Sequence, residues 1–416
     1  MNDVIVLKFG GTSVKSIVRI QHVAEIIAQR AVKEGTKCIA VVSAMGDTTD
    51  YLYKLAKQCS VHPDKRELDL LLSTGEQISI SLLAIVLQQL GVKAKSFTGP
   101  QIGILTDTTH SSARIKDINA ERIRKALTEY DVVVVAGFQG LSSEGEVTTL
   151  GRGGSDTSAV ALAAACGAST CDIYTDVDGV YTADPNAISD AKLLPSVSYD
   201  EILEMARNGA QVLHPRAVEL AQNYGLTVRV RNTFKPENEG TTIKGEETME
   251  LVRRASGVAV DGNQGCIKLS GIPAKLAVSR KITDILLEEG ISVDGVSQYS
   301  DENPEFKSIQ LDVRYADVDQ LAKQIDKIKE VAQAKSVKAE TNLAKVSLIG
   351  SGLSSEPKLT RELIATLEDA GVEITSLSSS EKRISCFVPR DKAKRAAQAL
   401  HTHYFTAEET RLTAAV

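Results

Sequence analysis

The sequence predicts an α/β protein whose first part, residues 1–245, forms a doubly wound and mainly parallel sheet. Two observations predict this class. Short apolar segments alternate with amphipathic ones, which is typical of strands joined by helices that cover both faces of a sheet. Glycine-rich or polar turns follow several of the apolar segments, at the strand ends where open α/β sheets bind ligands.

The second part of the chain contains an internal repeat. Gly271 recurs as Gly352 and Gly290 as Gly371, both 81 positions later (352 minus 271, 371 minus 290). Each copy has the order strand, helix, strand, strand, helix, which predicts two ferredoxin-like βαββαβ modules. Their expected boundaries are 257–335 and 340–416.

The elements of the first part follow from apolar periodicity and from glycine or polar stops. Ile17, Ile20, Val23 and Ile27 recur at helical spacings, for example. Helices are expected at 17–31, 78–90, 118–129, 159–165, 199–207 and 215–223. Strands are expected at 4–7, 38–42, 94–97, 132–136, 171–174 and 227–230.

Composition excludes several classes of protein. The 416 residues are 43% hydrophobic and 25% charged, which predicts two or three globular domains. A net charge of -6, with no basic block, argues against a nucleic-acid partner. No run of 18 apolar residues and no leader-like segment is present, and the six cysteines are scattered. We expect a cytoplasmic protein without membrane partners, with reduced cysteines in its core.

Two glycine-rich loops stand out. The segment 151–159 (GRGGSDTSA) has three glycines, a cation and a carboxylate directly before a helix. It could bring bare amides to an anion, or it could be an ordinary capped glycine turn. The segment 8–14 (KFGGTSV) joins a strand to a helix, but its lysine precedes the glycines, unlike that of the usual P-loop. Two such loops predict one nucleotide site built from distant segments.

Three further polar stretches could carry ligand contacts. The segment 43–50 follows a strand, which is a usual ligand position or a plain connecting loop. In the segment 73–77, Glu76 could complement a helix dipole or bind a substrate ammonium group. The segment 175–185 has three aspartates that could contact hydrated magnesium or a nucleotide, or form an ordinary turn. His110 is interpreted as structural.

Six motifs, in chain order, resemble those of the bacterial aspartate kinases. They are KFGGTSV at 8–14, VSAMG at 42–46, STGE at 73–76, the loop 151–159, the turn 175–185 and VLHPRA at 212–217. The resemblance covers essentially the whole chain. It implies an amino-acid-kinase domain followed by two ACT modules.

The resemblance implies transfer of the γ-phosphoryl group of ATP, bound with Mg²⁺, to the β-carboxylate of L-aspartate. The product is 4-phospho-L-aspartate, at the head of lysine, threonine and methionine synthesis. A carboxylate nucleophile is already ionised at pH 7 and needs no general base. Because two anions must meet, cations, Mg²⁺ and backbone amides are expected to supply most of the catalysis.

The resemblance also implies roles for individual residues. Lys8 would stabilise charge on the transferring phosphoryl group, and Asp156 would lie near the phosphates and the metal. The implied ATP-binding residues are Lys8, Phe9, Gly10, Gly11, Ser155, Thr175, Asp176, Tyr181, Asp184 and Pro185. The implied aspartate-binding residues are Ser43, Thr49, Glu76, Arg152, Gly153 and Gly154. We expect Mg²⁺ to be bound through ATP and not by protein ligands. Asn186 stands where many relatives have an arginine or a lysine.

The two modules depart from the pattern of ACT modules that bind amino acids. Such modules usually have Pro-Gly at the first helix and Asn at the second strand. The residues at these places are Lys275-Leu276 and Ser292 in the first module, and Pro357-Lys358 and Glu373 in the second. The implied effector residues are Val293, Asp294 and Gln298. We therefore expect lysine or threonine to inhibit weakly or in an altered way.

The resemblance further implies a homodimer or an α2β2 assembly, because ACT modules of the family pair between subunits. Met249 stands where some relatives restart translation to make a separate regulatory subunit, or it is a linker methionine. Two rival functions are another kinase of the same fold, such as an acetylglutamate or uridylate kinase, and an inactive amino-acid sensor. The STGE segment and the ACT modules argue against the first, and intact Lys8, Arg152 and Asp156 argue against the second.

Overall fold

The computed structural model describes residues 4–33, 35–210, 212–245, 255–274, 277–288, 291, 293–314, 324–351, 353 and 357–406. The chain forms two compact units. The first unit comprises Met1–Tyr181, Lys192–Arg207 and Gln211–Glu250, and the second comprises Thr182–Ala191, Asn208–Ala210 and Leu251–Val416. The predictions that depend on Met249, Lys275, Leu276, Ser292 and the Asp294 side chain lie outside the described residues.

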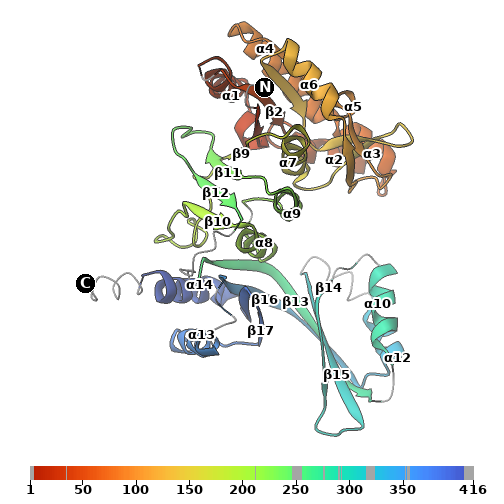
Figure 1. Cartoon of the computed structure of the whole chain (residues 1–416). Coiled ribbons are helices and arrows are strands. Elements are labelled where there is room, and N and C mark those ends of the chain that lie inside the picture. Colours follow the sequence, from red (N-terminus) through yellow and green to blue (C-terminus); the bar gives the residue numbers. More distant parts are fainter. Residues whose placement is uncertain are drawn as a thin grey trace, which may run out of the picture. The chain divides into compact units, whose positions relative to one another are not determined.

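The first unit is built on an eight-stranded sheet (Figure 1). Its strands are β1 (Val4–Phe9), β2 (Lys37–Val42), β3 (Ala94–Phe97), β6 (Val132–Ala136), β9 (Thr170–Thr175), β10 (Ser196–Ser198), β11 (Val228–Asn232) and β12 (Thr241–Lys244). Their order is β10-β12-β11-β9-β1-β2-β6-β3. The six strands from β11 to β3 are parallel, and only β12 pairs antiparallel, with β11. The predicted doubly wound, mainly parallel fold is confirmed.

Helices connect and cover these strands. They are α1 (Ile17–Ala28), α2 (Thr48–Cys59), α3 (Lys65–Leu72), α4 (Thr74–Gln89), α5 (Gly99–Ile102), α6 (Ala120–Glu129), α7 (Gly154–Cys166), α8 (Tyr199–Arg207) and α9 (Pro215–Tyr224). Both α4 and α7 begin earlier than the predicted 78 and 159, because polar residues and glycine are tolerated in a first turn whose N–H groups need no helical acceptor. The motifs at 73–77 and 151–159 therefore lie largely in helix N-termini rather than in loops.

A small second sheet carries the loop before α7. Its order is β5-β4-β7-β8, from β4 (Ile104–Thr106), β5 (Ile115–Ile118), β7 (Gln139–Ser142) and β8 (Val147–Thr149). The sequence analysis did not predict these strands, which are only three or four residues long. Ile118 belongs to β5 rather than to the predicted helix at 118–129.

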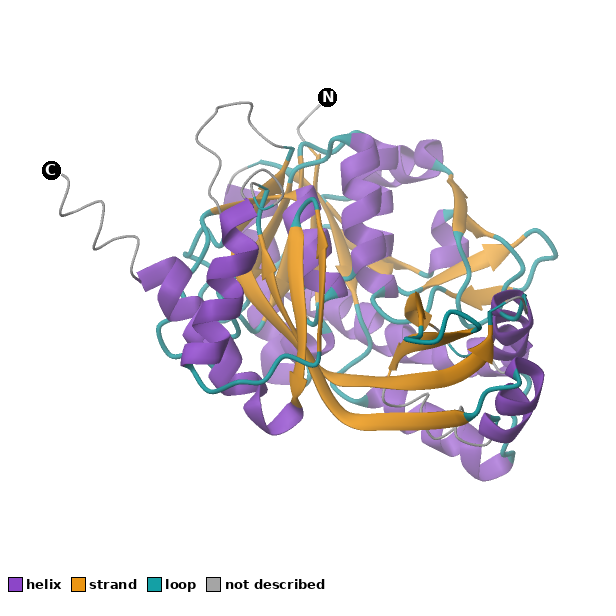
Figure 2. Ribbon diagram, turned by 90° about the horizontal axis from the view of Figure 1, so that it is seen from below, coloured by secondary structure: helices purple, strands orange, loops and turns teal. Residues whose placement is uncertain are grey.

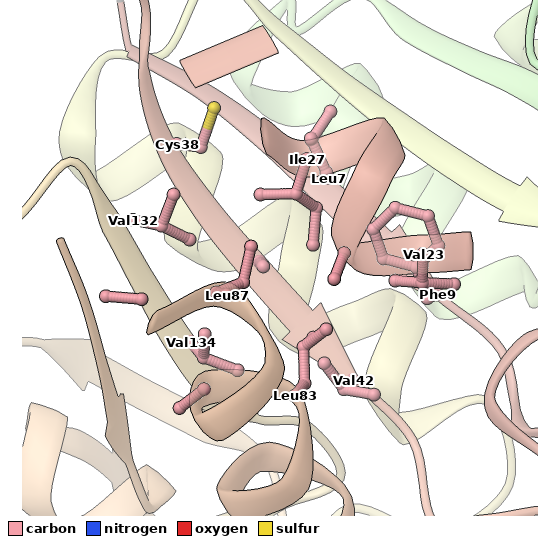
Figure 3. Packing of buried hydrophobic residues seen from close by; sticks show 14 of the residues in the cluster. Leu7, Phe9, Val23, Ile27, Cys38, Val42, Leu83, Leu87, Val132 and Val134 are labelled. Carbon is pink, nitrogen blue, oxygen red and sulfur yellow. The ribbon is translucent and has the colours of Figure 1, made fainter. Parts of the chain in front are cut away.

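The apolar periodicity correctly identifies the core of the first unit. Figure 3 shows Leu7 and Phe9 of β1 among Val23 of α1 and Leu83 and Leu87 of α4, all buried. The helical run Lys65–Gln89 is long and apolar enough to cross a membrane, but half of its most apolar window is buried, as in the core helix of a globular unit.

The six cysteines are all unpaired. Cys38, Cys171, Cys266 and Cys386 are buried, as predicted, whereas Cys166 is half-buried. Cys59 is exposed, so its expected core position is wrong. It is the last residue of α2, where the helix meets solvent.

The second unit contains one six-stranded antiparallel sheet of order β14-β15-β13-β16-β18-β17. Figure 2 shows strands in orange and helices in purple. Its strands are β13 (Gly257–Pro273), β14 (Val293–Ser300), β15 (Phe306–Arg314), β16 (Ser336–Ile349), β17 (Ser376–Ser380) and β18 (Arg383–Pro389). Its helices are α10 (Ser279–Glu288), α12 (Ile325–Ala332), α13 (Pro357–Asp369) and α14 (Ala393–His401). The predicted ferredoxin-like modules are present.

The two modules share their central strands. One half of β13 pairs with β15 and with the start of β16, and its other half, Gly257–Asp261, pairs with Lys345–Ile349 at the end of β16. Only Leu343–Ile349 of β16 pairs with β18. The repeat in the sequence does not reveal this sharing, because it marks equivalent positions and not strand partners.

The segment Thr182–Ala191 belongs to the second unit although it lies early in the chain. Ala183 and Ile188 are buried in the same cluster as Leu400 of α14. The Thr182 carbonyl accepts a hydrogen bond from the Val258 N–H at 2.7 Å. This segment contains the predicted ATP-binding residues Asp184 and Pro185.

Candidate active site

The carboxyl ends of the parallel strands define one edge of the large sheet, and the chain connections diverge there. From β1 the chain passes through α1 to β2 on one side, whereas β9 is followed by β11 on the other side. In open α/β sheets such a divergence leaves a crevice between neighbouring strand ends, which is the usual ligand position. The predicted segments 8–11 and 175–181 both lie at this place.

Lys8 lies at the centre of this edge. Strand alternation directs Leu7 and Phe9 into the core with α1 and α4, and turns Lys8 to the opposite face, against α7. Lys8 Nζ is 2.6 Å from Asp156 Oδ1 in the first turn of α7, and the two side chains are 11% and 12% exposed. The pair holds a cation beside a helix N-terminus, where unpaired N–H groups attract anions.

The Gly10-Gly11 turn lies against two other strand ends. The Gly10 N–H donates to the Tyr174 carbonyl of β9 at 3.3 Å, and the Gly46 N–H donates to the Gly11 carbonyl at 3.0 Å. A Cβ on Gly11 would lie 3.0 Å from the Ala44 carbonyl oxygen. A side chain on Gly11 would press on this backbone, so glycine favours the close approach and leaves the turn without a side chain over its backbone.

Glycine also allows the start of α7 to reach this edge. Gly153, the residue before the helix, has φ 65°, and Gly154 is the first helical residue. A Cβ on Gly137, which follows β6, would lie 2.8 Å from the Ser155 Cβ. Ser155 and Asp156 are thereby placed at the strand ends, as the nucleotide hypothesis requires.

The predicted aspartate-binding side chains approach from the β2 side. The Ser43 N–H donates to the Phe9 carbonyl at 3.1 Å, and Thr49 lies in the first turn of α2. Glu76, in the first turn of α4, is 2% exposed, and its Oε1 accepts the Ala44 N–H at 3.0 Å. Its Oε2 is buried and has no hydrogen-bond partner, so this oxygen could bind an incoming donor.

Arg152 is a cation of the candidate site that no carboxylate among the described residues neutralises. It is exposed, in the turn between β8 and α7, and within the described part of the chain its guanidinium makes no hydrogen bond or ion pair. A guanidinium binds a carboxylate through two parallel hydrogen bonds. Arg152 is therefore available to a carboxylate ligand.

The predicted ATP loop begins at the end of β9. The Thr175 carbonyl accepts the Thr233 N–H at 2.8 Å, and the Thr175 hydroxyl donates to Asp176 Oδ1 at 3.2 Å. The Thr233 hydroxyl is 2.6 Å from the Ser13 hydroxyl. The loops after β1, β9 and β11 are thus tied together, and the loop that leads to Tyr181 starts from this junction.

Two residues of this loop cluster were missed by the sequence analysis. Asn232 and Lys235, at and after the end of β11, both donate to the Asp178 carboxylate, Lys235 at 2.9 Å. Lys235 holds the pKa of Asp178 below its usual range, and burial raises the pKa of the neighbouring Tyr181. The rule that singled out Ser43, a polar residue after a buried strand, would have found Asn232 and Lys235 as well.

Two groups of predicted ligand-binding residues belong to the second unit and not to the sheet edge of the first. Asp184 and Pro185 lie in the second unit, where the Asp184 carboxylate accepts the N–H and the side-chain amide of Asn186. The effector residues Val293 and Gln298 lie on β14, and Gln298 Oε1 accepts a hydrogen bond from the Ser279 hydroxyl at 3.4 Å. These ligand roles stay predictions.

Comparison with known proteins decides the family. Residues 3–232 match the amino acid kinase family, and residues 338–402 match an ACT domain. The aspartokinase of Geobacillus stearothermophilus is 46% identical over 406 residues, which cover 98% of both chains. The chain belongs to the aspartokinases.

Other aspartokinases agree with this assignment. That of Bacillus sp. (strain MGA3) is 46% identical over 95% of this chain and 96% of the relative. The structure of E. coli aspartokinase III in complex with aspartate and ADP (R-state) has a TM-score of 0.81 at 26% identity, and covers 97% of this chain and 100% of that chain. The structure of the same enzyme in complex with lysine and aspartate (T-state) has a TM-score of 0.76 at 27% identity, over 97% and 99%. Membership makes the chain a kinase.

The buried Glu76 gives this aspartokinase a testable dependence of stability on pH. Burial raises the pKa of Glu76 from 4.5 to about 8. Between these values the folded protein binds a proton that the unfolded chain does not, so stability falls as pH rises, by up to about 1.4 kcal/mol per pH unit. A Glu76→Gln variant lacks this proton and is expected to gain stability relative to the wild type from about pH 5 to above pH 8.

Urea unfolding of both proteins without substrates, at pH 5.5 and 8.5, measures this difference. Other titrating groups contribute equally to the two proteins, so the difference isolates Glu76. Stability curves that stay parallel across this pH range would contradict the prediction.

Proposed function

We propose that the chain transfers the γ-phosphoryl group of ATP to the β-carboxylate of L-aspartate, giving 4-phospho-L-aspartate. Three observations support this: Lys8 lies beside the α7 N-terminus, a buried Glu76 oxygen has no partner, and Arg152, in the turn that leads into α7, has no partner among the described residues. Lys8 suits a phosphoryl anion, Glu76 an ammonium group and Arg152 a carboxylate. An amino acid with a second carboxylate, together with a triphosphate, uses all three.

The roles of these residues follow from charge. Lys8, with the Gly11 amide beside it, would stabilise negative charge on the transferring phosphoryl group, whereas the Gly10 N–H is already donated to the Tyr174 carbonyl. An ammonium group beside Glu76 would favour its ionised form, so binding would release a proton at neutral pH. The β-carboxylate is ionised at pH 7 and would attack without a general base.

We propose Mg²⁺ as the ion that accompanies ATP. Within the described residues no three His, Cys, Asp or Glu side chains are grouped to hold a metal. A single carboxylate, Asp156, faces Lys8, and this suits a magnesium ion held mainly by phosphate oxygens and water. The ion would neutralise phosphate charge, and Asp156 would contact its hydration shell.

An assay with ATP, Mg²⁺ and L-aspartate tests the proposed reaction. Hydroxylamine traps an acyl phosphate as a hydroxamate, which would form with L-aspartate. N-acetyl-L-glutamate, UMP and no acceptor serve as controls. Turnover with N-acetyl-L-glutamate or UMP instead would assign the chain to another kinase of the fold. No turnover with any acceptor would favour the inactive amino-acid sensor.

We propose that lysine or threonine inhibits the chain weakly or in an altered way. The residues at 275–276, 292, 357–358 and 373 differ from the pattern of ACT modules that bind amino acids. We expect saturating lysine to remove less than half of the activity. A titration against L-aspartate turnover checks this, with E. coli aspartokinase III, which was solved with lysine, as the sensitive control. Strong inhibition at similar concentrations in both enzymes would contradict it.

A cytoplasmic homodimer or α2β2 assembly is proposed for the holoenzyme. β14 and β17 are the two edges of the six-stranded sheet, so each has a row of backbone groups that another strand could pair with. Native mass spectrometry of the complex gives the subunit number and detects a second species that begins at Met249.

A further inference from the structure

The turn that carries Arg152 has few interactions of its own that could fix its conformation. Gly151 and Gly153, on either side of Arg152, have φ 79° and φ 65°, and Gly154 follows. Glycine loses more conformational freedom on ordering than any other residue, and this turn has no side chain except the exposed Arg152 that could pack against the protein. The position of the guanidinium therefore depends on the residues that flank the turn.

Asp69 of α3 fixes the residue where β8 ends, two positions before Gly151. The Asp69 carboxylate is fully buried and accepts the Thr149 N–H at 3.0 Å and the Thr149 hydroxyl at 2.6 Å. It also accepts the Ser111 N–H at 2.9 Å and lies 2.9 Å from His110 Nδ1. One buried charge thus ties α3, the segment before β5 and the start of the Arg152 turn.

Arg216 of α9 fixes the next residue. Its Nη1 donates to the Leu150 carbonyl at 2.6 Å and its Nη2 to the Ala113 carbonyl at 2.9 Å. The Ala113 N–H in turn donates to the Thr149 carbonyl at 2.9 Å. The planar fork of a guanidinium can hold two carbonyls at once, which a lysine ammonium at the same place does less well.

The other side of the turn rests on the same helix. His214 is the residue that precedes α9 and accepts the Arg216 N–H at 3.3 Å. A Cβ on Gly153 would lie 2.2 Å from the His214 ring, so Gly153 is seated directly on it. The start of α9 therefore supports the Arg152 turn from both ends.

We propose that Asp69 and Arg216 are positioning residues that set the affinity for the amino-acid substrate by holding the Arg152 turn in its binding geometry. Neither bonds the substrate: Asp69 has no exposed surface, and Arg216 is occupied by two backbone carbonyls. This inference rests on the proposed function, in which Arg152 binds a substrate carboxylate. It gives a role to Arg216, within the motif at 212–217, and to Asp69, which lies outside all six motifs.

The test is steady-state kinetics of the full-length protein with Arg216→Lys and Arg216→Met. Loss of a charge-assisted hydrogen bond is expected to raise the KM for L-aspartate about tenfold in Arg216→Lys and more in Arg216→Met. The KM for ATP and kcat should stay within about threefold, because Lys8 and its loop are unchanged. Arg207→Gln is the matched control, since Arg207 pairs with Glu219 on the surface and should leave every constant unchanged.

A double-variant cycle separates positioning from a general loss of order. If Arg216 acts through Arg152, Arg216→Lys should raise the KM for L-aspartate in the wild type but not in an Arg152→Gln background. Additive effects would overturn the proposal, as would an unchanged KM in folded Arg216→Lys when Arg152→Gln itself raises it. If Arg152→Gln leaves the KM unchanged, the proposed function of Arg152 fails first.

Thr149→Val tests the Asp69 side without changing a charge. It replaces the hydroxyl that donates to Asp69 at 2.6 Å with a methyl group of similar size, so the main change is the loss of that hydrogen bond. It is expected to raise the KM for L-aspartate severalfold with kcat and the KM for ATP unchanged. An unaltered KM for L-aspartate, with circular dichroism and thermal unfolding confirming a folded protein, would remove Asp69 from the proposal.

Discussion

Replacing Lys8 with alanine is expected to lower kcat about 1,000-fold while the chain stays folded. Removal of one group that stabilises transition-state charge typically costs about 100- to 1,000-fold, and here the loss also leaves Asp156 unopposed near the phosphates. The remaining carboxylate would repel the triphosphate. The KM for ATP should therefore rise as well. Hydroxamate assays and thermal unfolding measure both consequences.

The matched control for Lys8 is Lys37→Ala. Lys37 begins β2, at the opposite edge of the sheet, and pairs with Asp131 at 2.8 Å. Its loss removes an ion pair but no charge near the strand ends, so kcat should stay at the wild-type value. A Lys8→Ala protein that retains more than a tenth of the wild-type kcat would contradict the role of Lys8. One that fails to fold would assign it an architectural role.

Replacing Arg152 with glutamine is expected to raise the KM for L-aspartate about 100-fold, with a much smaller change in the KM for ATP. A charge-assisted hydrogen bond contributes about 1.5–3 kcal/mol, and a bidentate pair uses two of them. Because Arg152 is exposed and has no partner among the described residues, its removal should not change the temperature of unfolding. A raised KM for L-aspartate together with an unchanged temperature of unfolding would therefore identify a binding role for Arg152 rather than a structural one.

Arg152→Lys and Arg122→Gln complete that experiment. Lysine keeps the charge but loses the planar fork, and should recover only part of the affinity. Arg122, an exposed arginine of α6, should be replaceable without effect on either KM. Equal increases in both KM values for Arg152→Gln would mean that Arg152 does not discriminate the amino acid from the nucleotide.

The sequence predicts the parts of the site that are local in the chain. Lys8 with its two glycines, and Asp156 at the start of a helix, are recognisable because strand, turn and helix signals stand side by side. The meeting of these two segments follows from the parallel sheet, whose carboxyl ends share one edge. The meeting of the two loops is thus predicted, whereas the Lys8–Asp156 ion pair is seen only in the structure.

The supports of the site could not be predicted in the same way. Asp69 contacts Thr149 and Ser111 across 80 and 42 residues, and no periodicity or turn signal links such positions. Arg216 reaches the Leu150 carbonyl, a backbone group that every residue has. The site strands β7 and β8 are too short for alternation to be recognised.

The shared strands β13 and β16 have a consequence for how the second unit loses its structure. Because each runs through both ACT modules, fraying one module removes ladder partners from the other. We therefore expect the two modules to unfold together, as a single cooperative unit.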